Sequence, residues 1–181
     1  KNLMGNGIIN KQAYSIIGEM LVYESILKKN RTAKWTGGYF GTYDIETRDS
    51  GYEVKSTLKK YESTISVSSH YQLEKKKSLE LHFCRFEKSE QGYSINMLVE
   101  NLINLGYDRT VLENQLDKLG AEKGASLRND KYKLLEWRMY TVDDNFPRIT
   151  MDSFKNGGLP SGITKITYTV DLEGLKYRIG E

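Results

Sequence analysis

The clearest hydrophobic pattern in the chain lies in residues 10–29, where apolar side chains recur at the spacing of one helix face. Asn10 stands at the expected N-cap and lysines occupy the last turn, so this segment is predicted to be a helix. The glycine-bearing residues 33–41 predict a loop. Residues 42–47 and 51–58 alternate in polarity on either side of the turn sequence RDSG, and this pattern predicts a β-hairpin.

Three shorter patterns complete the first half of the chain. Residues 63–69 are rich in β-branched side chains and predict a strand, residues 70–77 predict a short helix, and residues 78–86 predict an apolar strand. In that last strand His82 alternates with apolar neighbours, and we expect its side chain to point outward. The order helix, three strands, helix, strand is typical of a small α/β unit.

Beyond residue 90 the pattern changes to helices followed by strands. Residues 94–106 and 108–120 have helical spacing and each ends at a glycine, with Asp108 as the N-cap of the second helix. Residues 132–142 and 163–172 have the pattern of strands, and the loop between them contains both prolines of the chain. We therefore expect an α+β extension in this half of the chain.

The composition is that of an ordinary soluble globular protein, since 38% of the 181 residues are hydrophobic and 28% are charged. A formal net charge of +3 permits a nucleic-acid partner without requiring one. The single cysteine, Cys84, lies in an apolar run and is expected to be a buried, inert thiol, which fits a reducing cytoplasm. No apolar run approaches the ~20 residues of a membrane-spanning helix, so no membrane partner is expected.

Asp44, Glu53 and Lys55 stand out because they interrupt strand-like sequence. Side chains alternate along a strand, so Glu53 and Lys55 share one face, about 7 Å apart. If the hairpin pairs antiparallel, Asp44 lies on the neighbouring strand and on the same side as Glu53. Two opposed carboxylates repel each other unless a cation lies between them, and a divalent metal ion supplies that cation.

Magnesium suits such a site, because it is commonly held by one or two carboxylates together with water and substrate phosphate oxygens. The chemistry that this arrangement favours is metal-assisted phosphodiester hydrolysis. Lys55 then orients or deprotonates the attacking water, or offsets charge on the phosphate, and the sequence does not choose among these roles. The competing interpretation is a solvated hairpin face with a Glu53–Lys55 or cross-strand ion pair, worth at most about 1 kcal/mol.

The spacing of Asp44, eight residues and then EVK at 53–55, after a helix that contains GE at 18–19, resembles the PD-(D/E)XK nuclease superfamily, the fold of many restriction endonucleases. More narrowly, the chain is similar to a bacterial family classed with the PD-(D/E)XK proteins. The landmarks of that similarity run from about residue 17 to residue 172 and are GEMLVYESIL, WTG, YDI, YEVKST, ISVSSHYQL, FPRI and LPSGITKITYTVDL. Tyr43 stands where the superfamily's name has a proline.

The resemblance implies an α/β fold with a restriction-endonuclease-like core, in which helices flank a mixed central sheet. This core is expected in residues 1–88, and residues 89–181 are expected to form a C-terminal α+β extension packed on it. The implied activity is DNA cleavage that depends on Mg²⁺ or Mn²⁺, in restriction or phage defence. The implied partners are DNA and other defence proteins, such as a methyltransferase or an ATPase, and many nucleases of this fold act as homodimers.

The resemblance also implies functional residues. Those expected to be catalytic are Asp44, Glu53, Lys55 and Glu19, and all but the lysine are expected to be metal ligands. Glu24 competes with Glu19 as the helix carboxylate, but it projects about 140° away and lies along the most apolar stripe. Gln72 and His70 are the expected substrate contacts.

Two other interpretations remain. The chain could be a catalytically silent nucleic-acid-binding or scaffold subunit that keeps the nuclease fold, but silent members usually lose one of the residues Asp44, Glu53 and Lys55. Residues 94–119 and the strands after them could instead form a winged helix-turn-helix. Because residues 108–119 lack the basic cluster of a recognition helix, a packing role is favoured for them.

Overall fold

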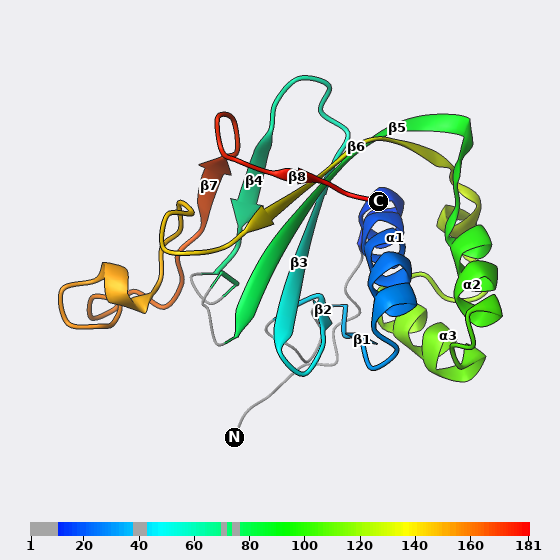
Figure 1. Ribbon diagram of the computed structural model, residues 1–181, viewed down its shortest axis with the longest axis horizontal. Helices are drawn as coiled ribbons and strands as arrows, with labels where there is room; N and C mark the ends of the chain where they lie inside the picture. The colour runs from blue at the N-terminus through cyan, green and yellow to red at the C-terminus, as the bar shows by residue number, and fades with distance from the viewer. Residues whose placement is uncertain (1–10, 38–42, 70–71, 74–76) are drawn as a thin grey trace.

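The computed structural model of the protein describes residues 11–37, 43–69, 72–73 and 77–181. A mixed six-stranded sheet forms its centre, in the order β1-β2-β3-β5-β6-β8 (Figure 1). These strands are β1 (Lys34–Trp35), β2 (Ile45–Glu46), β3 (Ser50–Thr57), β5 (Ser78–Tyr93), β6 (Tyr132–Thr141) and β8 (Arg178–Ile179). Strands β3 and β5 are parallel and the other neighbours are antiparallel. This is the predicted α/β class, and it is compatible with a restriction-endonuclease-like core.

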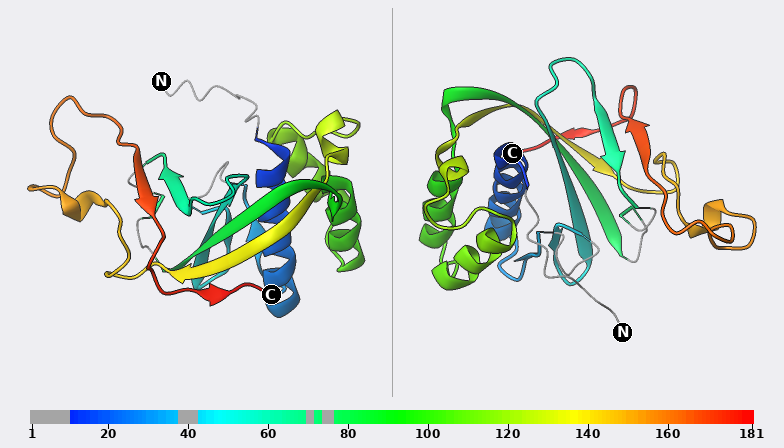
Figure 2. Two further views of the ribbon diagram at one scale, coloured as in Figure 1. Left: turned by 90° about the horizontal axis from the view of Figure 1, so that it is seen from above. Right: turned by 180° about the vertical axis from the view of Figure 1, so that it is seen from behind.

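Helices cover one face of this sheet (Figure 2). α1 (Ala13–Lys29), α2 (Ile95–Asn104) and α3 (Arg109–Lys118) share one buried apolar cluster with Val54 and Cys84 of the sheet. Cys84 is fully buried, as predicted, and this burial raises the pKa of its thiol, which disfavours the reactive thiolate. Among the described residues, no helix is both long and apolar enough to cross a membrane.

A second, smaller sheet lies on the other face. β4 (Thr64–Val67) and β7 (Tyr168–Asp171) pair antiparallel and share a second buried cluster with β5 side chains such as Phe83. Because side chains alternate along a strand, and Lys55 pairs with Phe83 in register, Glu53 and Lys55 face this second layer. Val54, between them, faces the helices.

Helix α1 lies close against β3. A Cβ atom added at Gly18 would stand 2.2 Å from the Ser56 hydroxyl oxygen, so a larger residue there would require the Ser56 side chain to move. The next residue, Glu19, is thereby brought to β3. On the edge of β3 that faces away from β5, β2 pairs with β3 only through Ile45 and Glu46. Beyond Tyr52, β2 no longer covers this edge, so side chains can form hydrogen bonds with the β3 backbone there.

Several predicted elements have different limits. The first helix begins at Ala13 with Gln12 in the N-cap position, and the predicted cap, Asn10, lies outside the described residues. Residues 34–35, predicted as a loop, form β1 because they pair with β2. Of the predicted short helix, Gln72 and Leu73 lie in a turn, and residues 70–71 and 74–76 are outside the described part.

The second half of the chain completes the same sheet. β5 extends to Tyr93, well past the predicted end at residue 86, because β6 pairs along most of its length. The expected boundary at residue 88 therefore lies inside a strand. Helices α2 and α3 begin as predicted, and Asp108 caps α3 by accepting a hydrogen bond from the Val111 N–H at 2.9 Å. β7 spans only residues 168–171 of the predicted 163–172.

The prediction that His82 points outward is wrong, because its side chain is buried on the helical face of the sheet. The Trp137 indole N–H donates to His82 Nδ1 at 2.9 Å, and His82 Nε2 lies 2.9 Å from Glu80 Oε1. Alternation gives the face to which a side chain points, but here both faces of the sheet are covered by other elements.

Candidate active site

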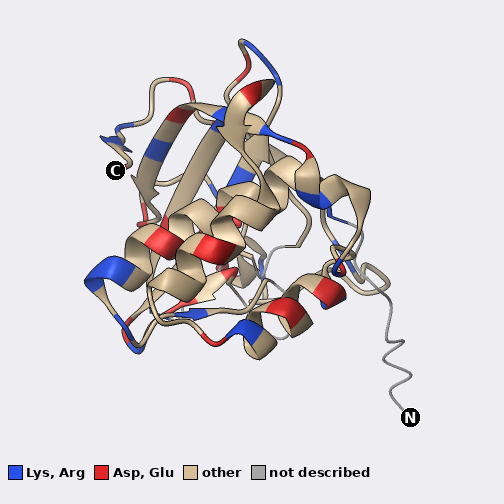
Figure 3. Ribbon diagram, turned by 90° about the vertical axis from the view of Figure 1, so that its right-hand side faces the viewer, with Lys and Arg blue, Asp and Glu red and all other residues tan. Residues whose placement is uncertain are grey.

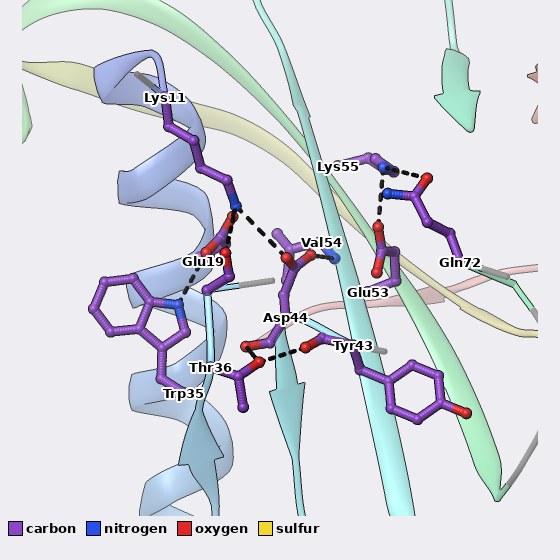
Figure 4. Close-up of polar contacts among 11 residues, drawn as sticks. Lys11, Glu19, Trp35, Thr36, Tyr43, Asp44, Glu53, Val54, Lys55 and Gln72 are labelled. Carbon is purple, nitrogen blue, oxygen red and sulfur yellow. Dashed lines mark hydrogen bonds and ion pairs between the residues drawn. The ribbon is translucent and has the colours of Figure 1, made fainter. Parts of the chain in front are cut away.

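Asp44 lies just before β2, against the edge of β3 that β2 leaves uncovered (Figure 4). The Val54 backbone N–H donates to Asp44 Oδ2 at 2.8 Å, which satisfies the edge of β3 at that point. The backbone N–H groups of Thr36 and Gly37 donate to the Asp44 carbonyl oxygen at 2.9 Å and 3.1 Å. Asp44 is therefore held by its side chain and by its backbone, and it is buried.

Glu53 and Lys55 lie on the same face of β3, as the alternation of the strand predicts. Lys55 Nζ is 2.9 Å from Glu53 Oε1, and it also donates to Gln72 Oε1 at 3.5 Å. Gln72 Oε1 is fixed by the Ser68 N–H, which donates to it at 2.9 Å. The structure thus brings Gln72 beside Lys55. His70, the other expected substrate contact, lies outside the described residues.

Glu19 is the carboxylate that helix α1 contributes. It is 2% exposed, and the Trp35 indole N–H donates to its Oε2 at 2.9 Å, which fixes the direction of the side chain. Glu24 has a different environment, because it forms an ion pair with Lys28 at 2.7 Å on the same helix. Of the two candidate helix carboxylates, Glu19 is the one that lies beside Asp44.

Lys11 joins Glu19 to Asp44, although no pattern in the sequence singles it out. Its ammonium group forms a short ion pair with Glu19 Oε1, lies 3.6 Å from Asp44 Oδ1 and donates to the Gly37 carbonyl oxygen at 3.2 Å. Lys11 stands eight residues before Glu19, outside the observed helix, so no helical spacing connects the two. Only the folded chain brings them together.

The three carboxylates form one electrostatic group. Burial, and then the negative charge of Asp44, raise the pKa of Glu19 to about 7, and Lys11 opposes this rise in part. Burial and the charge of Asp44 likewise raise the pKa of Glu53 to about 8, against the opposing effect of Lys55. Glu19 also contributes to the rise at Glu53. Ionisation of all three carboxylates would therefore place more negative charge in the site than its two lysines balance.

The two lysines are held as ammonium groups. Burial alone would lower the pKa of Lys55, but the attraction of Glu53 and the hydrogen bond to it outweigh burial and raise the pKa. The same balance holds for Lys11, where Glu19 and Asp44 outweigh burial. Lys55 is therefore suited to offset negative charge, and in this arrangement it is a poor general base.

Stability should depend on pH because of the two glutamates. In the unfolded chain both glutamates release their protons near the ordinary pKa of 4.5. In the folded protein the pKa is about 7 for Glu19 and about 8 for Glu53. Between pH 4.5 and pH 8 the folded state therefore binds more protons than the unfolded state, so the free energy of unfolding should fall by about 1–3 kcal/mol as the pH rises through this range. Urea unfolding in EDTA at about pH 5.5, 7 and 8.5 measures this slope. Glu53→Gln should reduce the slope, and a stability that rises with pH would contradict the raised pKa values of the two glutamates.

The carboxylates of Glu19, Asp44 and Glu53 have the oxygen ligands that a divalent cation prefers, although in the described residues they do not yet form a complete metal site. Within the described ranges, no group of three or more His, Cys, Asp or Glu side chains forms a metal site as the side chains stand. Magnesium, however, is commonly held by one or two carboxylates, and Asp44 with Glu53 supplies these. Lys11 already occupies a position between Glu19 and Asp44 where a positive charge is bound by oxygen atoms.

Comparison with known proteins gives one match. The sequence model of the family described as "Putative PD-(D/E)XK family member, (DUF4420)" matches residues 6–173. No curated protein and no solved structure matches the chain significantly.

Proposed function

Because the chain belongs to this PD-(D/E)XK family, and because Glu19, Asp44, Glu53 and Lys55 come together at strand β3, we propose that it is a nuclease that hydrolyses DNA with Mg²⁺ or Mn²⁺. The single observation that carries the proposal is the position of Asp44. Burial, together with the charge of this carboxylate, raises the pKa of both Glu19 and Glu53, so one buried group acts on a carboxylate from the helix and on a carboxylate from the strand.

Each residue has a distinct part in the proposed reaction. Asp44 and Glu53 hold the metal ion, and Glu19 assists through the metal or through a bound water. Such an ion, when bound, makes its water a stronger acid and offsets the charge of a phosphate. The Lys55 ammonium group, held by Glu53, faces the charge that develops on the phosphate during attack. Gln72 keeps this ammonium group in place through its side-chain oxygen.

The direct test is incubation of the purified protein with linear and circular DNA, in Mg²⁺, in Mn²⁺ and in EDTA. Cleavage of either DNA only in the presence of the metal is expected, and cleavage of the circle would identify an endonuclease. Cleavage that is indifferent to metal would point to a contaminating activity. A protein that neither cleaves DNA nor binds a divalent ion would support the alternative, a silent subunit that retains the fold.

The helix pair is a poor candidate for the DNA-contacting surface. Arg109 on α3 forms an ion pair with Glu100, and Arg128 forms one with Glu113 at 2.7 Å. Figure 3 shows acidic as well as basic residues along the helices on this side. Arg109 in this helix pair, and Arg128 in the segment that follows it, thus already have carboxylate partners within the protein. A winged-helix interpretation of this half therefore gains no support.

The loop between β3 and β4 has the features of a nucleic-acid contact. Tyr61 is 82% exposed, the largest value among the large hydrophobic side chains of the described part. Lys60 Nζ lies 5.5 Å from the centre of its ring, and Lys59 is also exposed. Exposed aromatic rings beside cations commonly stack on bases in proteins that bind single strands. The chain passes from Lys55 to Tyr61 in six residues, so the loop lies within about 20 Å of the site.

Tyr61→Ala should therefore weaken DNA binding by about tenfold, the loss of one base-stacking contact. Fluorescence anisotropy with a labelled oligonucleotide in EDTA measures the affinity without cleavage. The matched control is Tyr93→Ala, which removes a half-exposed tyrosine at the end of β5 and should leave the affinity nearly unchanged. Equal effects of the two substitutions would remove the loop from the proposed contact surface.

The biological setting is also a proposal. The family resemblance suggests a role in restriction or phage defence, beside a methyltransferase or an ATPase, and action as a homodimer. Co-purification from the native host, followed by identification of associated proteins, tests this part separately from the chemistry.

A further inference from the structure

Lys11 occupies an unusual place for a lysine. Three oxygen atoms surround its ammonium group, and they come from three separate parts of the chain: Glu19 on α1, Gly37 in the following loop and Asp44 before β2. Figure 4 draws this group between the carboxylates of Glu19 and Asp44. Carboxylate and backbone carbonyl oxygens are also the ligands that hard divalent cations prefer. The ammonium therefore stands among ligands suited to a metal ion.

The balance of charges in the site favours replacement of Lys11 by a divalent ion over addition of the ion beside it. When all three buried carboxylates are ionised, as metal ligands must be, they carry three negative charges, and the two ammonium groups of Lys11 and Lys55 carry two positive charges. A divalent ion added beside both lysines would leave the buried cluster with excess positive charge, which is costly in a poorly solvated place. A divalent ion that replaces Lys11 would leave it neutral.

Of the three carboxylates and two lysines, the lysines are the groups that can leave most easily. The Lys11 side chain is 23% exposed, compared with 20% for Lys55, 9% for Asp44 and less for the two glutamates. A lysine side chain has four rotatable bonds and can turn its ammonium group into water. Lys55, by contrast, is fixed on the central strand β3 between Glu53 and Gln72.

We propose that Lys11 is a built-in counter-ion that holds Glu19 and Asp44 together and is displaced when a divalent metal ion binds between them. This inference rests on the proposed nuclease function, because it concerns the same carboxylates. Lys11 then positions the two carboxylates when no metal is bound. Because its ammonium group competes with the metal ion for their oxygen atoms, the lysine lowers the affinity of the site for the metal.

The test is isothermal titration of Mn²⁺ into the full chain, without DNA, for the wild type and for Lys11→Met. Removal of the competing charge should tighten Mn²⁺ binding by at least about tenfold, since nearby charges in a protein interact strongly. The rise of the melting temperature with Mn²⁺ should be larger in the variant, and this second readout remains valid if the variant is less stable without metal. Lys11→Arg, which keeps the charge, should bind Mn²⁺ no more tightly than the wild type.

Lys55→Met is the matched control, because it removes the same charge from the same cluster but from a lysine that pairs with Glu53 instead. A clearly larger gain in affinity for Lys11→Met than for Lys55→Met supports displacement. An unchanged or weaker affinity in Lys11→Met, with normal binding in the wild type, contradicts the role of Lys11 and leaves the proposed function standing. Failure of every variant to bind Mn²⁺ contradicts the proposed function itself.

Discussion

Asp44→Asn is expected to reduce metal-dependent DNA cleavage by about a thousandfold or more, equivalent to roughly 4 kcal/mol of lost transition-state stabilisation. The charge of Asp44 acts on both Glu19 and Glu53, so its removal should weaken a cation site formed by these carboxylates. The asparagine can still accept the hydrogen bond from the Val54 N–H, so the local backbone should be preserved. The measurement is the initial rate of cleavage at saturating Mg²⁺.

Asp49→Asn is the control for this substitution. It makes the same chemical change in the same hairpin, at an exposed position in the turn between β2 and β3, and it should leave the rate within about twofold of the wild type. Urea unfolding of both variants separates catalysis from stability. Cleavage by Asp44→Asn at the wild-type rate would remove Asp44 from the site.

Lys55→Met is expected to reduce the rate by about a hundredfold to a thousandfold, while Mn²⁺ still binds. The ammonium group of Lys55 is held in its charged form by Glu53, so the variant loses the positive charge that we propose faces the substrate phosphate. Methionine has nearly the same length and shape as lysine without the charge, which limits the change in packing. Single-turnover cleavage at saturating metal measures the loss.

Lys55→Arg distinguishes the two roles that the sequence leaves open for this lysine. Arginine keeps the positive charge but does not exchange protons in proteins, so it should retain clearly more activity than methionine if Lys55 offsets charge. Equal loss in the two variants would indicate proton transfer instead. Lys28→Met, on the exposed side of α1, controls for the loss of a lysine and should cleave normally.

The parts of the site that follow from local geometry could be predicted from the sequence. Alternation along one strand places Glu53 and Lys55 on the same face, and a hairpin brings Asp44 beside that strand. Family resemblance, and the angle between Glu19 and Glu24 on a helix, select the helix carboxylate that lies beside Asp44 in the structure. The hydrogen bond from Trp35 to Glu19 does not follow from the sequence, because the glycine-bearing segment that contains β1 predicts a loop.

The contacts that join distant parts of the chain could not be predicted. Lys11 reaches Gly37 and Asp44 through the folded backbone, and no periodic pattern connects these positions. The pairing of β4 with β7 joins residues about a hundred positions apart, and it decides which face of the sheet is covered. The error at His82 has the same origin, since burial of a strand residue depends on elements elsewhere in the chain.

The most direct test of the metal site is a crystal of the protein soaked in Mn²⁺ and measured at the manganese absorption edge. We expect an anomalous peak about 2 Å from carboxylate oxygens of Asp44, Glu53 and Glu19, with the Lys11 ammonium group moved away from Glu19. A map without a peak at this place, at a Mn²⁺ concentration that supports cleavage, and with Lys11 still bound to Glu19 and Asp44, would contradict both the site and the displacement of the lysine.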